Sequence, residues 1–208
     1  MKLGILSDIH EQVDELRTAI DILRKHEADR FIVLGDTCDT NVRVEETISL
    51  LRDVGAIGVW GNHDFGLCID QSDEIRHHYS TDVLNFMGSF LPRLEIDGCL
   101  FTHNEPWLDP NKVEDLWYFD GLPETQKKLN QSFAAVPQRV MFIGHHHDWM
   151  IGSTAGIVPW NGEGPITLEP TQQYLVVVNA VCHGYCALFD TTKHELIPFS
   201  DGSDVRLT

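Results

Sequence analysis

The chain has 208 residues, of which 15 are lysine or arginine and 32 are aspartate or glutamate, so its formal charge is −17. A chain this acidic, without a run of basic residues, lacks the positive surface with which proteins bind nucleic acid or anionic membranes. Its hydrophobic content of 42% is too high for a disordered chain. We therefore expect a single domain over residues 1–208, with neither nucleic acid nor a membrane as a partner.

The sequence also bears on compartment and assembly. Its apolar runs are far shorter than the roughly 20 residues that a membrane helix needs, and its first residues do not resemble a signal peptide. The five cysteines are scattered and form no CxxC pair, which favours a reducing compartment. We expect a cytoplasmic protein. The sequence leaves the oligomeric state open and is compatible with a homo-oligomer.

The N-terminal third of the chain alternates apolar runs with helical periodicity. Apolar runs at 3–6, 31–34 and 56–60 predict strands. Between them, apolar residues three or four positions apart predict a helix at 13–28 and another from 44 to the glycine at position 55. This alternation of strands and helices is typical of a parallel sheet with crossover helices.

The remainder of the chain is richer in predicted strands. Residues 70–90 are expected to be helical in pieces, and 94–102 to form a strand or a hairpin broken by an Asp-Gly pair. A helix is expected at 124–135, whereas Pro198 and the polar tail are expected to be peripheral. Residues 104–137 combine prolines with aromatic residues, and we expect them to form a lid or a substrate-selecting elaboration. Further strands are expected at 140–143, 166–168, 174–178 and 185–189.

Five of the apolar runs end just before a residue that can bind a metal ion. In chain order these residues are Asp8 and His10, Asp36, Asn62 and His63, His103, and His145 and His147. Sites in open α/β sheets form where the carboxyl ends of strands meet, so the fold would bring these side chains into one cleft. Carboxylate, imidazole and amide ligands without thiolate suit Mn, Fe, Zn or Ni rather than a structural zinc. Even without His63, seven ligands suffice for two ions roughly 3.5–4 Å apart if Asp36 bridges them.

The order of these motifs resembles that of the calcineurin-like metallophosphoesterases, in particular their small bacterial phosphodiesterase branch. The family pattern is DxH, GDxxD, GNH[DE], a lone histidine and GHxH. The matching segments here are Asp8-Ile9-His10, Gly35-Asp36-Thr37-Cys38-Asp39, Gly61-Asn62-His63-Asp64, His103 and Gly144-His145-His146-His147. A weaker similarity covers 179–190. The resemblance implies an α/β fold, a four-layer α/β/β/α sandwich of two mixed β-sheets flanked by helices.

The resemblance also implies a role for each matching residue. The metal ligands would be Asp8, His10, Asp36 and His147 for one ion, and Asp36, Asn62, His103 and His145 for the other. His63 would be the catalytic histidine that faces the phosphate, and Asp39 would hydrogen-bond and orient it. Asn62 and His63 would contact the substrate. The implied cofactor is a pair of divalent transition-metal ions.

These residues predict a metal-dependent hydrolase of small organic phosphodiesters or phosphomonoesters, in which a metal-activated hydroxide attacks phosphorus in line. A dinucleoside polyphosphate hydrolase and a phosphoprotein phosphatase are alternatives. Trp60 argues against the latter, because several branches of the family have a phosphate-binding arginine at that position. A non-catalytic metal-binding scaffold is an alternative of another class, against which the complete set of ligands argues.

The pattern fixes no role for several neighbouring residues. Glu11 stands where the family often has glycine, and it would either crowd the cleft or add a carboxylate near the metals. His183 lies in the segment that replaces a glycine-rich turn of the family. We expect His146 to point away from the cleft and Cys38 to be a small buried residue. The indole of Trp117 would line the substrate pocket or pack in the interior.

Overall fold

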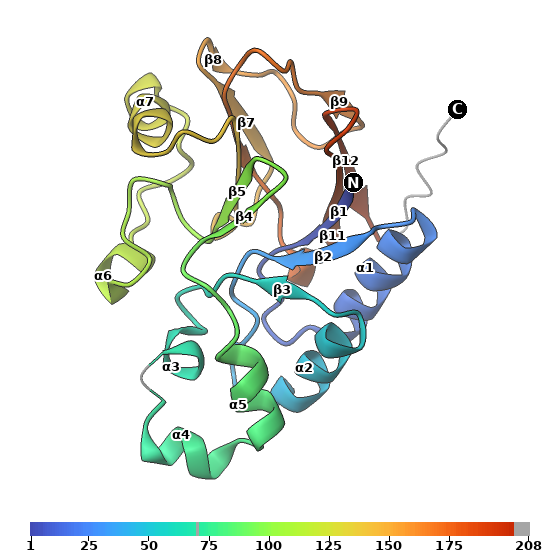
Figure 1. Ribbon diagram of the computed structural model, residues 1–208, viewed down its shortest axis with the longest axis vertical. Helices are drawn as coiled ribbons and strands as arrows, with labels where there is room; N and C mark the ends of the chain where they lie inside the picture. The colour runs from blue at the N-terminus through green and yellow to red at the C-terminus, as the bar shows by residue number, and fades with distance from the viewer. Residues whose placement is uncertain (70, 202–208) are drawn as a thin grey trace.

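The computed structural model describes residues 1–69 and 71–201. Two six-stranded sheets lie face to face, and helices cover both outer faces (Figure 1). This arrangement confirms the predicted four-layer sandwich. The elements in chain order are β1 (Lys2–Leu6), α1 (Val13–Lys25), β2 (Arg30–Val33), α2 (Val44–Asp53), β3 (Ile57–Gly58), α3 (Phe65–Cys68), α4 (Asp73–His78), α5 (Thr81–Met87), β4 (Leu94–Ile96), β5 (Cys99–Thr102), α6 (Val113–Leu116), α7 (Gln126–Ala135), β6 (Val140–Ile143), β7 (Met150–Ser153), β8 (Gly156–Ile157), β9 (Ile166–Thr167), β10 (Tyr174–Val177), the 3-10 turn η1 (Val181–His183), β11 (Tyr185–Asp190) and β12 (Glu195–Ser200).

The first sheet has the order β3-β2-β1-β11-β12-β9. The strands β1, β2 and β3 are parallel and are joined by α1 and α2, as the alternation of strands and helices predicts. Successive side chains of a strand face opposite ways. Leu3 and Ile5 therefore face the second sheet, whereas Leu6 packs under the helices. Gly4 lets α1 approach closely, since a Cβ there would lie 3.0 Å from Leu23.

The second sheet has the order β4-β5-β6-β10-β7-β8, with α7 on its outer face (Figure 1). Phe142 of β6 faces the first sheet, whereas Met141 beside it packs against Leu129 of α7. The predicted break in 94–102 is a hairpin turn between β4 and β5. Asp97 and Gly98 both have positive φ, 52° and 79°, as a two-residue hairpin turn of type I′ requires.

The structure corrects the expectation that Pro198 is peripheral. Pro198 lies within β12, which pairs with β11 along its whole length. The next strand, β9, pairs only with Glu195 and Leu196, so the part of β12 that holds the proline has a neighbour on one side only. A proline is tolerated there because its missing N–H need not serve a second strand.

Several element boundaries differ from those predicted. The helix α1 ends at Lys25 rather than at residue 28, because Glu27 adopts φ 61° and Ala28 donates its N–H to the Leu23 carbonyl, which closes the last turn. The segment predicted to be helical in pieces forms α4 and α5, which begin at serine caps, Ser72 and Ser80. Position 70 of that segment and the tail from 202 lie outside the described residues. No helix in the described ranges is long and apolar enough to span a membrane.

Candidate functional site

The loops that follow β1, β2 and β3 in the first sheet and β5 and β6 in the second meet at one edge of the sandwich. Backbone hydrogen bonds join these loops. The His10 N–H donates to the Asp36 carbonyl over 3.0 Å, and the Gly144 N–H donates to the His103 carbonyl over 3.0 Å. The fold thus brings together, from five loops, the ligand-type side chains that lie far apart in the sequence.

Glycines in these loops make room for the carboxylates. A Cβ on Gly61 would clash with the Asp36 carboxylate, and a Cβ on Gly144 would clash with Ser7 and crowd Asp8. The glycines that precede Asn62 and His145 in the sequence motifs are therefore required by close packing.

Much of the backbone at the site is in the left-handed region. The candidate ligands with positive φ, between 46° and 68°, are Asp8, His10, Asp36, His145 and His147. Non-glycine residues rarely adopt this conformation, although Asp and His tolerate it better than most, and it costs about 1 kcal/mol or more at each position. Such strain is concentrated where a fold must aim side chains at one point.

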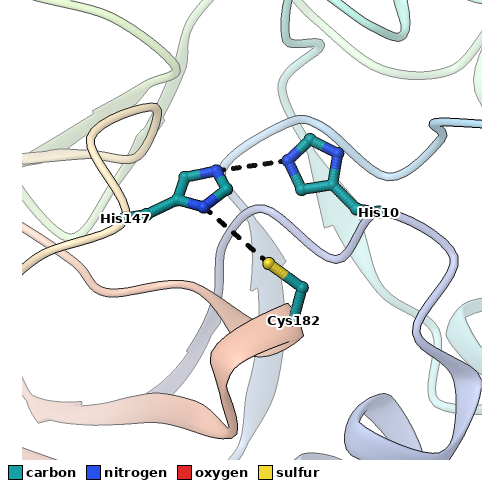
Figure 2. A group of neighbouring side chains, drawn as sticks. All are labelled: His10, His147 and Cys182. Atoms are coloured by element: carbon teal, nitrogen blue, oxygen red, sulfur yellow. Dashed lines mark hydrogen bonds between the residues drawn. The ribbon is translucent and has the colours of Figure 1, made fainter.

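The first donor group contains His10, His147, Asp8 and Asp36. The Nε2 atoms of His10 and His147 lie 3.2 Å apart (Figure 2). The Asp8 carboxylate is 3.3 Å from His147 Nε2, and Asp36 Oδ2 is 3.8 Å from His10 Nε2. Four side chains from three loops thus direct ligand atoms at one small volume.

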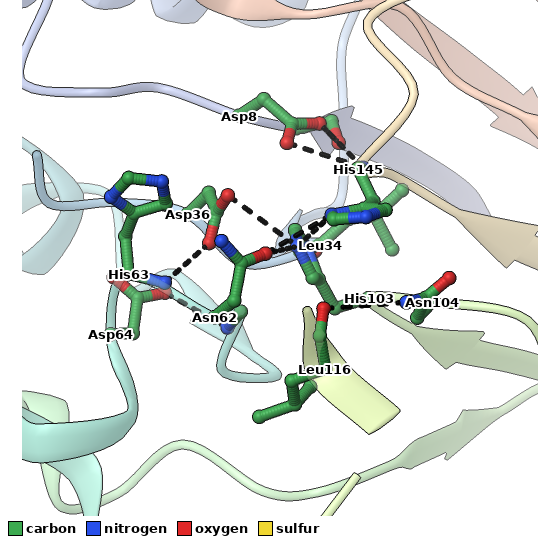
Figure 3. Close-up of polar contacts among 12 residues, drawn as sticks. Asp8, Leu34, Asp36, Asn62, His63, Asp64, His103, Asn104, Leu116 and His145 are labelled. Atoms are coloured by element: carbon green, nitrogen blue, oxygen red, sulfur yellow. Dashed lines mark hydrogen bonds and ion pairs between the residues drawn. The ribbon is translucent and has the colours of Figure 1, made fainter. Parts of the chain in front are cut away.

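The second donor group contains Asn62, His103, His145 and, again, Asp36 (Figure 3). The Asn62 Oδ1 atom lies 2.9 Å from His103 Nε2 and 3.0 Å from His145 Nδ1. Asp36 Oδ2 is 3.5 Å from His103 Nε2. The Asp36 carboxylate therefore faces both donor groups, as a ligand shared by two ions would.

The tautomers of two histidines fit metal binding. His103 Nδ1 must donate its proton to the Leu34 carbonyl over 2.7 Å, and His145 Nε2 must donate to the Tyr118 carbonyl over 3.1 Å, because a carbonyl can only accept. The nitrogens left as acceptors when each ring is neutral lie 3.2 Å apart. Two lone pairs at this distance repel unless a proton or a cation lies near them. An outer hydrogen bond that fixes the tautomer is usual for a metal-binding histidine, so the residues present fit divalent ions.

Without metal, protons on imidazoles balance the carboxylates. Burial alone would raise the pKa of Asp36, but His103 lowers it well below its usual range. Burial lowers the pKa of His103, yet the Asp36 charge outweighs it and raises that pKa to about 9. The hydrogen bond to Asp8 raises the pKa of His147 to about 10. Divalent ions would take the place of these protons, so metal binding is coupled to proton release.

The predicted catalytic histidine lies at the rim of this cluster. The His63 ring is partly exposed, and its Nδ1 atom is 3.7 Å from Asp39 Oδ1, an ion-pair distance that exceeds a hydrogen bond. His63 also comes within 4.8 Å of ligand atoms of His10 and Asp36. The ring is therefore close enough to touch a group bound between the donor groups.

Asp64 has a structural position that the motif did not reveal. Its buried carboxylate accepts N–H bonds from Thr37, Cys38 and Gly61, so it ties the loop after β2 to the loop after β3. Burial, followed by the charge of Asp36, raises the pKa of Asp64 to about 6. Asp64 thus holds the Asp36 and Asn62 loops in register.

Glu11 neither crowds the cleft nor points at the metals. Its buried carboxylate accepts four backbone N–H bonds of 2.7–2.8 Å, from Asp39, Asn41, Val42 and Arg43. Burial by itself raises the pKa of Glu11, but these donors lower it overall. The carboxylate therefore fixes the loop that carries Asp39, a task that sequence spacing alone could not show.

We expect Glu11→Gln to lower the free energy of unfolding by about 2–4 kcal/mol at pH 7. The NH2 group of the glutamine would face backbone N–H groups, and two donors cannot hydrogen-bond to each other. The folded-state pKa is depressed, so this stabilisation is present above the unfolded pKa of about 4.3 and is lost as pH falls through the folded value. Urea unfolding of the wild type and the variant at pH 7 and pH 4 measures this stabilisation. The exposed Glu74→Gln is the control. A loss below about 0.5 kcal/mol at pH 7 would contradict the role of Glu11.

Other residues singled out from the sequence lie beside the site. The Trp60 indole is buried and donates to the Pro110 carbonyl over 2.8 Å, so it anchors the 104–137 segment. His146 turns away from the donor groups, as expected, and its ring is buried 3.8 Å from the Glu105 carboxylate. His183 packs edge-on against the ring of His147, 5.1 Å between centroids.

Cys182 is a neighbour of the donor groups that the motifs did not indicate. Its Sγ atom lies 3.8 Å from Nδ1 of His147, the ring nitrogen opposite the one that faces His10 (Figure 2). Cys38, by contrast, is buried as expected, and burial, followed by the charge of Asp64, raises the pKa of its thiol well above the usual value. None of the five cysteines forms a disulfide.

Comparisons with known proteins bear on the family and the fold of this chain. A family model, the calcineurin-like phosphoesterase superfamily domain, matches residues 1–180. An uncharacterized protein of Methanocaldococcus jannaschii is 23% identical over 197 aligned residues, covering 84% of this chain and 73% of that protein.

Solved structures share the fold. A metallophosphoesterase from Sphaerobacter thermophilus has a TM-score of 0.77 at 18% identity, covering 96% of this chain and 87% of that one. An archaeal phosphodiesterase has a TM-score of 0.56 at 17% identity, covering 96% of this chain and 99% of that one. At these identities the structural likeness concerns the fold alone, whereas the family model covers most of the chain. The chain belongs to the calcineurin-like phosphoesterase superfamily.

Proposed function

We propose that this protein hydrolyses small organic phosphodiesters and phosphomonoesters with two divalent transition-metal ions. The observation that carries the proposal is the pair of donor groups that share the Asp36 carboxylate. One group would be completed by Asp8, His10 and His147, and the other by Asn62, His103 and His145. When bound, such ions supply positive charge to a phosphoryl group and lower the pKa of water.

The side chains at the rim would handle the substrate. The Oδ1 atom of Asn62 faces His103 and His145. Its amide nitrogen is therefore the donor left for a phosphoryl oxygen. His63 lies beside the shared carboxylate, where a charged or neutral imidazole can donate a proton or a hydrogen bond to the leaving oxygen. Asp39 Oδ1 lies 3.7 Å from Nδ1 of that ring, where the carboxylate can orient the imidazole.

The net charge restricts the substrate to small molecules. A charge of −17 repels long polyanions, whereas a single phosphoryl group is attracted to two bound cations. We therefore favour a small phosphoester over nucleic acid, and a cytoplasmic setting suits such a substrate.

A test uses protein stripped of metal and then supplied with Mn, Ni, Zn or Fe. We expect no turnover of bis-p-nitrophenyl phosphate or p-nitrophenyl phosphate without metal, and turnover of at least one of them with at least one metal. Turnover that is unaffected by chelation would contradict the proposal. Binding of two ions without turnover of any phosphoester would favour the metal-binding scaffold instead.

A further inference from the structure

Two large aromatic side chains are exposed directly beside the donor groups. Trp117 is 54% exposed and Phe119 is 61% exposed. The Trp117 ring lies 5.1 Å from the His63 ring, between centroids, and the Phe119 ring lies 5.7 Å from that of His145. Exposed tryptophan and phenylalanine are unfavourable in water, so two of them at the edge of one site indicate a surface that a ligand covers.

The segment that carries these rings is held firmly. Asn104 is buried, and its Nδ2 atom lies 3.1 Å from the carbonyls of both Asp115 and Tyr118. The Tyr118 carbonyl also accepts from His145, so the segment is attached to a candidate metal ligand. The backbone N–H of Trp117 donates to the Val113 carbonyl over 3.0 Å, which closes the last turn of α6. Trp117 is therefore exposed on a segment whose backbone is fixed by hydrogen bonds.

We infer that Trp117 stacks on a planar, uncharged aromatic group in the ester portion of the substrate. This inference rests on the proposed function, since it assumes that the phosphoryl group binds at the donor groups. Trp117 touches His63, which lies beside Asp36, so an aromatic group linked to the phosphoryl group would reach the indole face. The Asp39 carboxylate lies 3.7 Å from His63, against which Trp117 packs, and its charge disfavours a second anionic group there. An aryl ester and a nucleoside ester share this chemistry.

The test measures equilibrium binding to Mn-loaded protein by calorimetry, so it does not depend on turnover. The probes are methylphosphonate, phenylphosphonate and a nucleoside 5′-phosphonate, which share the phosphoryl group and differ in the attached group. Stacking on an aromatic side chain gives an expected preference for phenyl over methyl of about 10-fold. Trp117→Ala should abolish this preference without changing the Kd of methylphosphonate, and Trp117→Phe should retain part of it. Val113→Ala, at an exposed position of α6, is the control and should change neither Kd.

Each outcome is decisive. A larger loss on Trp117→Ala for phenylphosphonate assigns an aryl ester, and a larger loss for the nucleoside phosphonate assigns a nucleobase; both support stacking. If methylphosphonate binds but phenylphosphonate binds no more tightly, or if the preference survives in Trp117→Ala, stacking by Trp117 is overturned while the proposed function stands. If methylphosphonate does not bind at all, the proposed function fails and this inference fails with it.

Discussion

Replacement of Asp36 by asparagine is expected to reduce kcat for an aryl phosphodiester by about 10³-fold or more. Outer-sphere partners of metal ligands alone are worth about 10–100-fold, and the Asp36 carboxylate faces both donor groups. The substitution keeps the shape of the side chain but removes its charge, so the two cations lose the ligand that would hold them together. The measurement is kcat with excess Mn, together with the metal content of the purified variant.

The control for this substitution is Asp21→Asn, at an exposed position of α1. It removes the same charge from the chain and should leave kcat unchanged. If Asp36→Asn retains activity within threefold of the wild-type value in excess metal, the assignment of Asp36 as a shared ligand is wrong.

Replacement of His63 by alanine is expected to reduce kcat by about 10²–10³-fold while the protein still binds two metal ions. Proton transfer by a positioned side chain is worth about 10²–10⁴-fold, and His63 stands at the rim of the donor groups with Asp39 beside it. Because the imidazole would assist the leaving oxygen, the loss should be greater for a phenyl ester than for a p-nitrophenyl ester. Steady-state kinetics with both esters measures this difference.

The matched control is His78→Ala, which removes an exposed histidine of α4 and should leave both rates unchanged. Loss of metal from His63→Ala would contradict the catalytic role and indicate that His63 is a ligand, as its distance to His10 and Asp36 also allows. An equal loss for both esters would show that His63 does not act on the leaving oxygen.

The ligand-type residues could be read from the sequence because each stands directly after a buried apolar run. Asp8 and Asp36 follow β1 and β2, and the topology of parallel strands brings such ends together. The four-layer fold was expected because the order of these motifs resembles that of a known family. The motifs themselves depend on local order along the chain, which a single sequence contains.

The residues that support the ligands could not be read in this way. Glu11 acts on backbone N–H groups about thirty residues away in the sequence, and the Tyr118 carbonyl has no side-chain signature at all. Cys182 reaches His147 only through the pairing of β11 with β1, which places the turn before β11 beside Asp8. The sequence does not show that Pro198 lies within a strand, because the short length of β9, which permits a proline in β12, is a feature of the strand pairing.

The most direct test of two metal ions held by a shared Asp36 is a crystal structure of the Mn-loaded protein with anomalous diffraction data. We expect two anomalous peaks roughly 3.5–4 Å apart, one among Asp8, His10 and His147 and the other among Asn62, His103 and His145, with the Asp36 carboxylate contacting both. A single peak, or two peaks without Asp36 between them, would contradict the account.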